Sequence, residues 1–152
     1  MSQWQTVSAR IVPGYQIASG RSGNPRFPGG TLQMQHPHFA RLGLDLTPFH
    51  PGTLNVSIAP ARYTVGQARH TFRAVKWHTT EPAEDFSFFQ VRLVREGGSA
   101  VDGLIYYPHP ATKPEHLQPP DVLELLLPFV QGLAYGDPVL LEIPQEQMSI
   151  HL

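Results

Sequence analysis

The chain has 152 residues, of which 41% are apolar and 15% charged, a formal charge of −1 at pH 7, and no cysteine. Its length and apolar content predict one folded domain over residues 1–152, and the lack of cysteine excludes disulfides, thiolate metal sites and a cysteine nucleophile. The near-neutral charge provides no basic surface for nucleic acid or an anionic membrane, so we expect neither as a partner.

No apolar run is long enough to span a membrane, and the N-terminal sequence MSQWQTVSAR lacks the basic and apolar regions of a secretory signal. We therefore expect a cytoplasmic protein. Glycine and proline, with 13 and 16 residues, exceed their usual combined share of about 12%. Because they separate ordinary apolar runs, they favour an all-β fold of short strands joined by turns.

The first elements in chain order are a weak strand and a loop. Apolar residues alternate at Val7, Ala9 and Ile11, which favours a strand. The segment Ser19–Gly30 has the sequence SGRSGNPRFPGG. Its glycines and prolines exclude a helix or a central strand, so we expect an exposed loop.

A short helix is expected over Gln35–Gly43. Pro37 suits its first turn, and Gly43 suits the position just after its end. Phe39 and Leu42 would share one face of this helix.

Six later segments have the alternation or the composition of strands. In one of them, VLELLLPFV, the spacing of apolar residues does not distinguish a strand from a helix. Its length and the two prolines before it favour a buried strand. The six segments are Thr53–Ala59, His70–His78, Phe86–Arg95, Ala100–Tyr107, Val122–Val130 and Pro138–Ile143. Short strands with one short helix predict a small closed β-barrel.

The glycine loop is the first candidate site. Glycines allow successive backbone N–H groups to converge on an anion, and Arg21 adds positive charge, so the loop could hold a nucleotide phosphate. The candidate residues are Ser19, Gly20, Arg21 and Gly23. The loop matches neither common phosphate-binding fingerprint, so an ordinary turn stays open as the alternative.

The second candidate site follows the turn at Pro51 and Gly52. At a period of two, Thr53 and Asn55 lie on one face of the strand, and the apolar residues between and after them face the core. A hydroxyl and an amide oxygen can bind Mg²⁺ when phosphates supply the negative charge. The alternative is a solvated strand face.

The third candidate site surrounds a proline-rich bend and includes Thr112, His116, Asp121 and Glu124. Glu124 lies within the apolar run VLELLL. A carboxylate there is either on an exposed face or desolvated in a pocket with a raised pKa.

Several motifs follow one another along residues 14–143: an SG-x-x-G loop, a segment ending in LG, the block PGTLNV, the stretch DVLELLLP and the ending LAYGDPV. In this order they resemble the archaeal CTP-dependent riboflavin kinases. The late motifs of that family have the patterns D-V-[LI]-E-I-I-A-P and L-G-L-x-x-G-D-x-V. The block PGTLNV is the most specific part of the resemblance.

The resemblance implies one cradle-loop barrel, a six-stranded Greek-key barrel with a small helix. It also implies transfer of the CTP γ-phosphate to the ribityl 5′-hydroxyl of riboflavin, giving FMN and CDP. Thr53 and Asn55 would then hold Mg²⁺, and Glu124 is the candidate general base. The implied nucleotide-binding residues are Ser19, Gly20, Arg21, Gly23, Pro51 and Gly52, and the implied substrate-binding residues are Thr112, His116, Asp121 and Glu124.

Two other functions stay open. The glycine loop of the family usually contains the pattern G-x-G-E-G followed by an aromatic residue, whereas the loop here lacks the glutamate. A catalytically inactive barrel that binds a flavin or a nucleotide is therefore the main alternative. A structural or protein-interaction module is the third, and it would expose a contiguous apolar patch.

Overall fold

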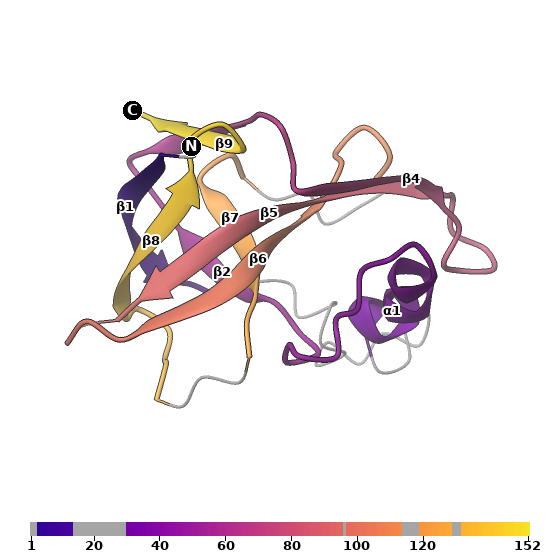
Figure 1. The fold of residues 1–152 in the computed structure, drawn as a ribbon, viewed down its shortest axis with the longest axis horizontal. Coiled ribbons are helices and arrows are strands. Elements are labelled where there is room, and N and C mark those ends of the chain that lie inside the picture. Colours follow the sequence, from indigo (N-terminus) through magenta and orange to yellow (C-terminus); the bar gives the residue numbers. More distant parts are fainter. Residues whose placement is uncertain (1–2, 14–29, 96, 114–118, 129–131) are drawn as a thin grey trace.

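The computed structural model describes residues 3–13, 30–95, 97–113, 119–128 and 132–152. These residues form nine strands and one helix (Figure 1), which confirms the all-β class with a single helix. The helix is α1 (Thr31–Arg41), and the strands are β1 (Trp4–Ile11), β2 (Leu54–Ser57), β3 (Arg62–Val65), β4 (His70–Val75), β5 (Glu84–Val94), β6 (Ala100–Pro108), β7 (Val122–Leu126), β8 (Pro138–Pro144) and β9 (Met148–His151).

Six of the strands form a closed ring. Their order is β5-β6-β7-β2-β1-β8, and β8 pairs back with β5, so the sheet meets itself. Apolar side chains from every strand of the ring fill its interior, which explains the alternation in the sequence. They include Ile11, Val56, Val91, Ile105, Leu125 and Leu141. The expected six-stranded arrangement is confirmed.

A second apolar core lies outside the ring. Strands β4 and β5 extend beyond the ring and pass over α1 (Figure 1). The ring of Phe39 in α1 packs edge-on against Phe86 and Phe88 of β5, with centroid distances of 5.0 and 5.2 Å. All three side chains are buried. Removing one such side chain typically costs about 3–5 kcal/mol, so this aromatic cluster fixes α1 to the sheet.

The helix begins earlier than the sequence predicts. It starts at Thr31, after Gly30, and not at Gln35. Pro37 therefore lies in the middle of α1, and its assignment to the first turn was wrong. The packing of the N-terminal half of α1, where Leu32 is buried against the second core, outweighs the proline signal.

The end of the helix follows the sequence more closely. Gly43 has a φ of 106°, its N–H donates to the Ala40 carbonyl, and the N–H of Leu44 donates to the Phe39 carbonyl. This is a Schellman motif, and the position predicted for Gly43 is confirmed. Leu42 occupies the C-cap and is 54% exposed, so it does not share the buried face of Phe39 as expected.

The predicted strands correspond to β2, β4, β5, β6, β7 and β8, and their ends differ from the observed ends by at most four residues. The alternation predicted across His70–His78 is broken by a bulge between Phe72 and Val75, where Ala74 has a φ of 54°. Strands β3 and β9, which pair with each other, were not predicted. The expected loop Ser19–Gly30 lies outside the described residues except for Gly30.

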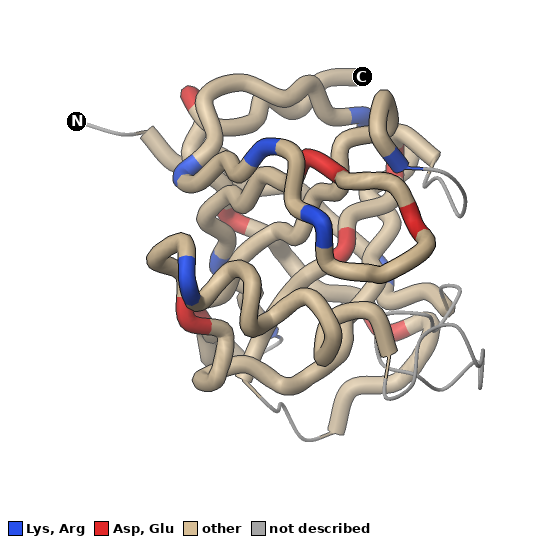
Figure 2. Tube along the Cα trace, turned by 90° about the vertical axis from the view of Figure 1, so that its right-hand side faces the viewer, with Lys and Arg blue, Asp and Glu red and all other residues tan. Residues whose placement is uncertain are grey.

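Basic and acidic residues are interspersed along the described chain (Figure 2). In the same part of the chain, α1 is far too short and polar to be a transmembrane helix.

Candidate metal and ligand site

Three side-chain oxygens come together beside the start of β2. Asn55 of β2 lies opposite Glu124 of β7 in the antiparallel register, so both side chains leave the same face of the sheet. The Thr53 hydroxyl lies 3.4 Å from Asn55 Oδ1 and 3.3 Å from Glu124 Oε1. We call Thr53, Asn55 and Glu124 the oxygen cluster.

The pleat of β2 explains why this cluster faces away from the ring interior. Leu54 and Val56 pack into the ring core, so Thr53 and Asn55 project from the opposite face. Asn55 is nevertheless 6% exposed, which shields its amide from most water. The predicted orientation of this pair is confirmed, and its role as a metal site stays a prediction.

The chemistry of the oxygen cluster suits a hard cation. A hydroxyl, an amide oxygen and one carboxylate are ligands that Mg²⁺ accepts, since it usually takes one or two carboxylates and completes its shell with phosphate and water oxygens. Within the described ranges, no three His, Cys, Asp or Glu side chains gather in one place. A cation at the oxygen cluster would thus depend on a phosphate-bearing ligand for further negative charge.

A pocket opens next to the oxygen cluster, where β6 and β7 separate. The two strands pair from Leu104 to Tyr106 and then diverge, and we call the space between them the β6–β7 pocket. Its lining includes tyrosine, proline and charged residues, namely Tyr63, Tyr106, Tyr107, Pro108, Pro110, Lys113 and Glu124. The volume of the pocket is about 30 Å³, so a flat ring system could contact these aromatic and proline side chains at its mouth but would not be enclosed. Because Glu124 belongs to both features, the pocket and the oxygen cluster are adjacent.

The tyrosines of the pocket stay protonated at neutral pH. Burial raises the pKa of Tyr63 to about 12, and Tyr107 and the carboxylates of Glu124 and Asp121 add to the effect. Burial also raises the pKa of Tyr107. Their hydroxyl groups are therefore available as hydrogen-bond donors.

A buried hydrogen bond connects α1 to the strand beside the oxygen cluster. The Tyr106 hydroxyl donates to Gln35 Oε1 at 2.6 Å, and both residues are buried. Burial, followed by the charges of Glu124 and Glu84, raises the pKa of Tyr106 well above its ordinary value. Tyr106 is the cross-strand neighbour of Glu124, so this contact holds α1 next to the oxygen cluster. Sequence analysis missed it because the partners are 71 residues apart.

Two of the other predicted substrate residues are neighbours in sequence of residues that line the pocket. The Thr112 hydroxyl accepts the N–H of Asp85 at 2.9 Å and donates to the His109 carbonyl at 3.3 Å, so it holds the turn after β6. Asp121 lies next to the pocket residue Val122, and its carbonyl accepts the N–H of Ile58. His116 lies outside the described residues.

Of the predicted nucleotide-binding residues, the structure describes two and leaves four undescribed. Pro51 and Gly52 form the turn before the oxygen cluster, where the Gly52 N–H donates to the His50 carbonyl at 2.8 Å. Ser19, Gly20, Arg21 and Gly23 lie outside the described residues.

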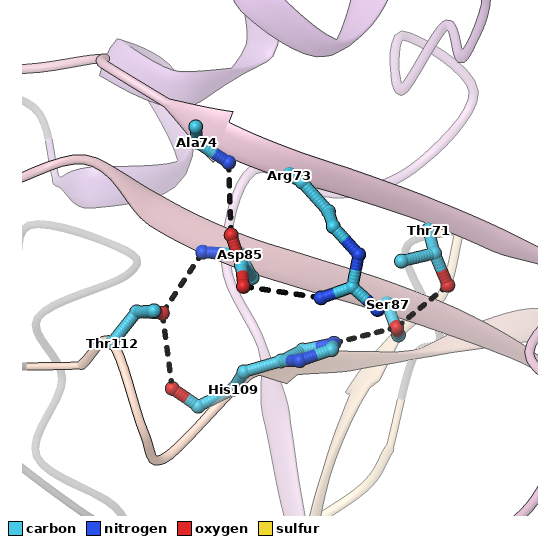
Figure 3. Close-up of polar contacts among 7 residues, drawn as sticks. All are labelled: Thr71, Arg73, Ala74, Asp85, Ser87, His109 and Thr112. Atoms are coloured by element: carbon cyan, nitrogen blue, oxygen red, sulfur yellow. Dashed lines mark hydrogen bonds and ion pairs between the residues drawn. The ribbon is translucent and has the colours of Figure 1, made fainter.

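A second polar cluster joins β4, β5 and the end of β6 (Figure 3). His109 Nε2 lies 2.7 Å from Ser87 Oγ, which in turn lies 2.9 Å from Thr71 Oγ1. On the same strands, Asp85 bonds the Arg73 guanidinium at 3.2 Å and the Ala74 N–H at 2.8 Å. The pairing of three strands creates this cluster, and no motif in the sequence indicates it.

Comparison with known proteins found no matching family model, no similar curated protein and no similar solved structure.

Proposed function

We propose that this chain is a riboflavin kinase-like phosphotransferase, which uses Mg²⁺ and CTP to convert riboflavin to FMN and CDP. The observation that carries the proposal is the contact between Thr53, Asn55 and Glu124. The resemblance assigns the first two to Mg²⁺ and the third to the flavin site, and the proposed reaction requires these two sites to be adjacent.

The β6–β7 pocket provides further support. Its tyrosine and proline side chains suit the flat ring system of a flavin, and the hydroxyl groups of Tyr63 and Tyr107 can donate hydrogen bonds. Glu124 lines the pocket and also contributes Oε1 to the oxygen cluster. A flavin in the pocket would thus direct its hydroxyl-bearing side chain towards the metal-bound phosphates.

In this mechanism the chain acts by positioning and by proton transfer. Mg²⁺, when bound, would supply positive charge for the phosphates of the nucleotide. Thr53 and Asn55 would hold the cation, and Glu124 would accept the proton of the ribityl hydroxyl as that oxygen bonds to the γ-phosphorus and the bond to CDP breaks. A general base of this kind usually contributes about 10²–10⁴-fold in rate.

The alternative is a catalytically inactive barrel that binds a flavin or a nucleotide. It is favoured by the sequence of the glycine loop, which lacks the glutamate of the family pattern. The pocket would then be retained and the phosphoryl transfer lost.

Isothermal titration with riboflavin, FMN, CTP and CDP, each with and without Mg²⁺, tests the proposal. We expect riboflavin to bind without Mg²⁺ and CTP to need it. In Asn55→Ala, Mg²⁺ should no longer promote the binding of CTP. In Ser57→Ala, a change on the same strand and face, Mg²⁺ should still promote it. Riboflavin binding with no nucleotide binding would favour the inactive alternative, and no binding of any ligand would exclude both.

A further inference from the structure

The turn after β6 forms one wall of the β6–β7 pocket. Pro110 and Lys113 line the pocket from this turn, and we call residues 109–113 the pocket turn. The carbonyl of His109 accepts the N–H groups of Thr112 at 3.1 Å and Lys113 at 3.0 Å. The hydrogen bonds that shape the pocket turn therefore converge on His109.

Contacts on the side away from the pocket fasten this turn to β5. The N–H of His109 donates to the Asp85 carbonyl at 2.9 Å, and the Thr112 hydroxyl accepts the N–H of Asp85 at the same distance. The imidazole adds a side-chain contact, since Nε2 lies 2.7 Å from the hydroxyl of Ser87, a buried residue (Figure 3). Ser87 is in turn hydrogen-bonded to Thr71 of β4.

We propose that His109 is a positioning residue of the β6–β7 pocket: its neutral imidazole holds the pocket turn against β5 through Ser87, and its protonation releases the turn. The protein part of this proposal is independent of any ligand. The identity of the pocket ligand as a flavin rests on the proposed function.

The groups around the imidazole explain why protonation opposes this contact. Burial lowers the pKa of His109; the carboxylate of Asp85 on β5 acts in the opposite sense, and the guanidinium of Arg73 on β4 lowers the pKa further. The ring of Tyr107 on β6, with a centroid 5.5 Å away, completes the surroundings. Because the attached state favours the neutral imidazole, a fall in pH favours the state in which the ring has moved into water.

Protonation of His109 reverses the direction of the hydrogen bonds that connect His109, Ser87 and Thr71. When Nε2 carries no proton, the Ser87 hydroxyl donates to it and can accept from Thr71. An imidazolium has only N–H donors, so Ser87 must turn its hydrogen towards Thr71 while a positive charge remains next to Arg73. In acid the attached state keeps a charged imidazolium partly buried, and this desolvation costs free energy that a ring exposed to water does not lose.

Amide hydrogen exchange tests the attachment without a ligand. The N–H groups of His109, Thr112 and Lys113 are measured by NMR at pH 7.5 and 5.5, corrected for the intrinsic exchange rate. In Ser87→Ala we expect them to exchange about tenfold faster at pH 7.5, because the loss of one buried contact typically costs about a factor of ten. Ser8→Ala, at an exposed position on β1, is the control and should not change them.

A conservative variant separates positioning from general destabilisation. His109→Gln retains a polar end group that can bond Ser87 but does not titrate, so its protection at pH 7.5 should equal that of the wild type and should not fall at pH 5.5. Thr71→Val, at an exposed position, replaces Ser87→Ala if that variant does not fold. Unchanged exchange of the three amides in the folded Ser87 or Thr71 variant would overturn the proposal.

Riboflavin affinity, measured by fluorescence quenching at the same two pH values, forms the second arm. We expect the wild type to bind riboflavin about fivefold to tenfold more weakly at pH 5.5 than at pH 7.5, because binding is coupled to the neutral form of His109. His109→Gln has no titrating group at this position and should bind riboflavin equally at both pH values. Exchange results as expected with no riboflavin binding would support the attachment and refute the flavin pocket. Tight riboflavin binding with unchanged exchange in the variants would refute the attachment alone.

Discussion

Replacing Tyr106 with phenylalanine tests whether a buried hydrogen bond holds α1 beside the oxygen cluster. The change removes one hydroxyl and leaves Gln35 Oε1, a buried acceptor, without its donor at 2.6 Å. The Thr31 hydroxyl, which also bonds Tyr106, loses its partner too. An unsatisfied buried group costs about 1–3 kcal/mol, which for a domain of this size lowers Tm by roughly 2–12 °C.

The reciprocal variant should cost less. In Gln35→Met the Tyr106 hydroxyl can still bond Thr31, so we expect a smaller loss of unfolding free energy than in Tyr106→Phe. The double variant should lose less unfolding free energy than the two single variants lose together. The difference should be about 0.5–3 kcal/mol, because both changes remove the same contact.

Urea denaturation of the two single variants, the double variant and the wild type measures these free energies. Tyr135→Phe is the matched control at a residue that is 58% exposed, and it should change stability by less than about 0.5 kcal/mol. A Tyr106→Phe protein as stable as this control, or strictly additive single changes, would refute the role of the hydrogen bond.

Three further predictions concern buried charge, pH and close packing. Glu84 is buried, accepts a hydrogen bond from Trp77 Nε1 at 3.0 Å and has a pKa raised by burial, so stability falls as pH rises from the unfolded-state pKa through the raised pKa. Glu84→Gln should therefore raise Tm at pH 8 and not at pH 4, and a lower Tm at pH 8 would contradict this. Burial is the first cause of a lowered pKa at the three histidines His38, His70 and His109. The neutral forms of these histidines stabilise the folded state fully above about pH 6.5, and this stabilisation is lost as pH falls through their folded-state pKa values. In Glu84→Gln, which lacks the opposing titration of Glu84, urea denaturation should show a free energy of unfolding that falls from pH 7 to 5. A free energy that does not change with pH would contradict this. A Cβ at Gly103 would lie far inside contact distance of the Leu126 carbonyl oxygen; Gly103→Ala should therefore cost at least about 1–3 kcal/mol, and a variant with wild-type stability would show that β6 and β7 are not this close.

The sequence was most informative where one face of an element is buried. The alternation of Leu54 and Val56 correctly predicted which side of β2 faces the ring core, and hence the shared face of Thr53 and Asn55. A period of two is a local property, so it can be recognised without knowing which strand is the neighbour.

Features that depend on distant pairing could not be predicted. Each strand of the β3–β9 pair has only four residues, and its partner lies more than 80 residues away. The contact of Gln35 with Tyr106 and that of Ser87 with His109 arise only after the strands are in register. The early start of α1 also reflects tertiary packing, which outweighed the local preference of Pro37 for a first turn.

Formation of FMN from riboflavin tests the central claim most directly. Wild-type protein, Asn55→Ala, Glu124→Gln and Ser57→Ala are incubated with riboflavin and Mg²⁺, with CTP and separately with ATP, and FMN is measured by chromatography. We expect FMN from the wild type and from Ser57→Ala, none from Asn55→Ala, and a rate about 10²–10⁴-fold lower for Glu124→Gln. A wild-type protein that forms no FMN with either nucleotide would contradict the proposed activity, and equal rates for Asn55→Ala and the wild type would reject the metal site at the oxygen cluster.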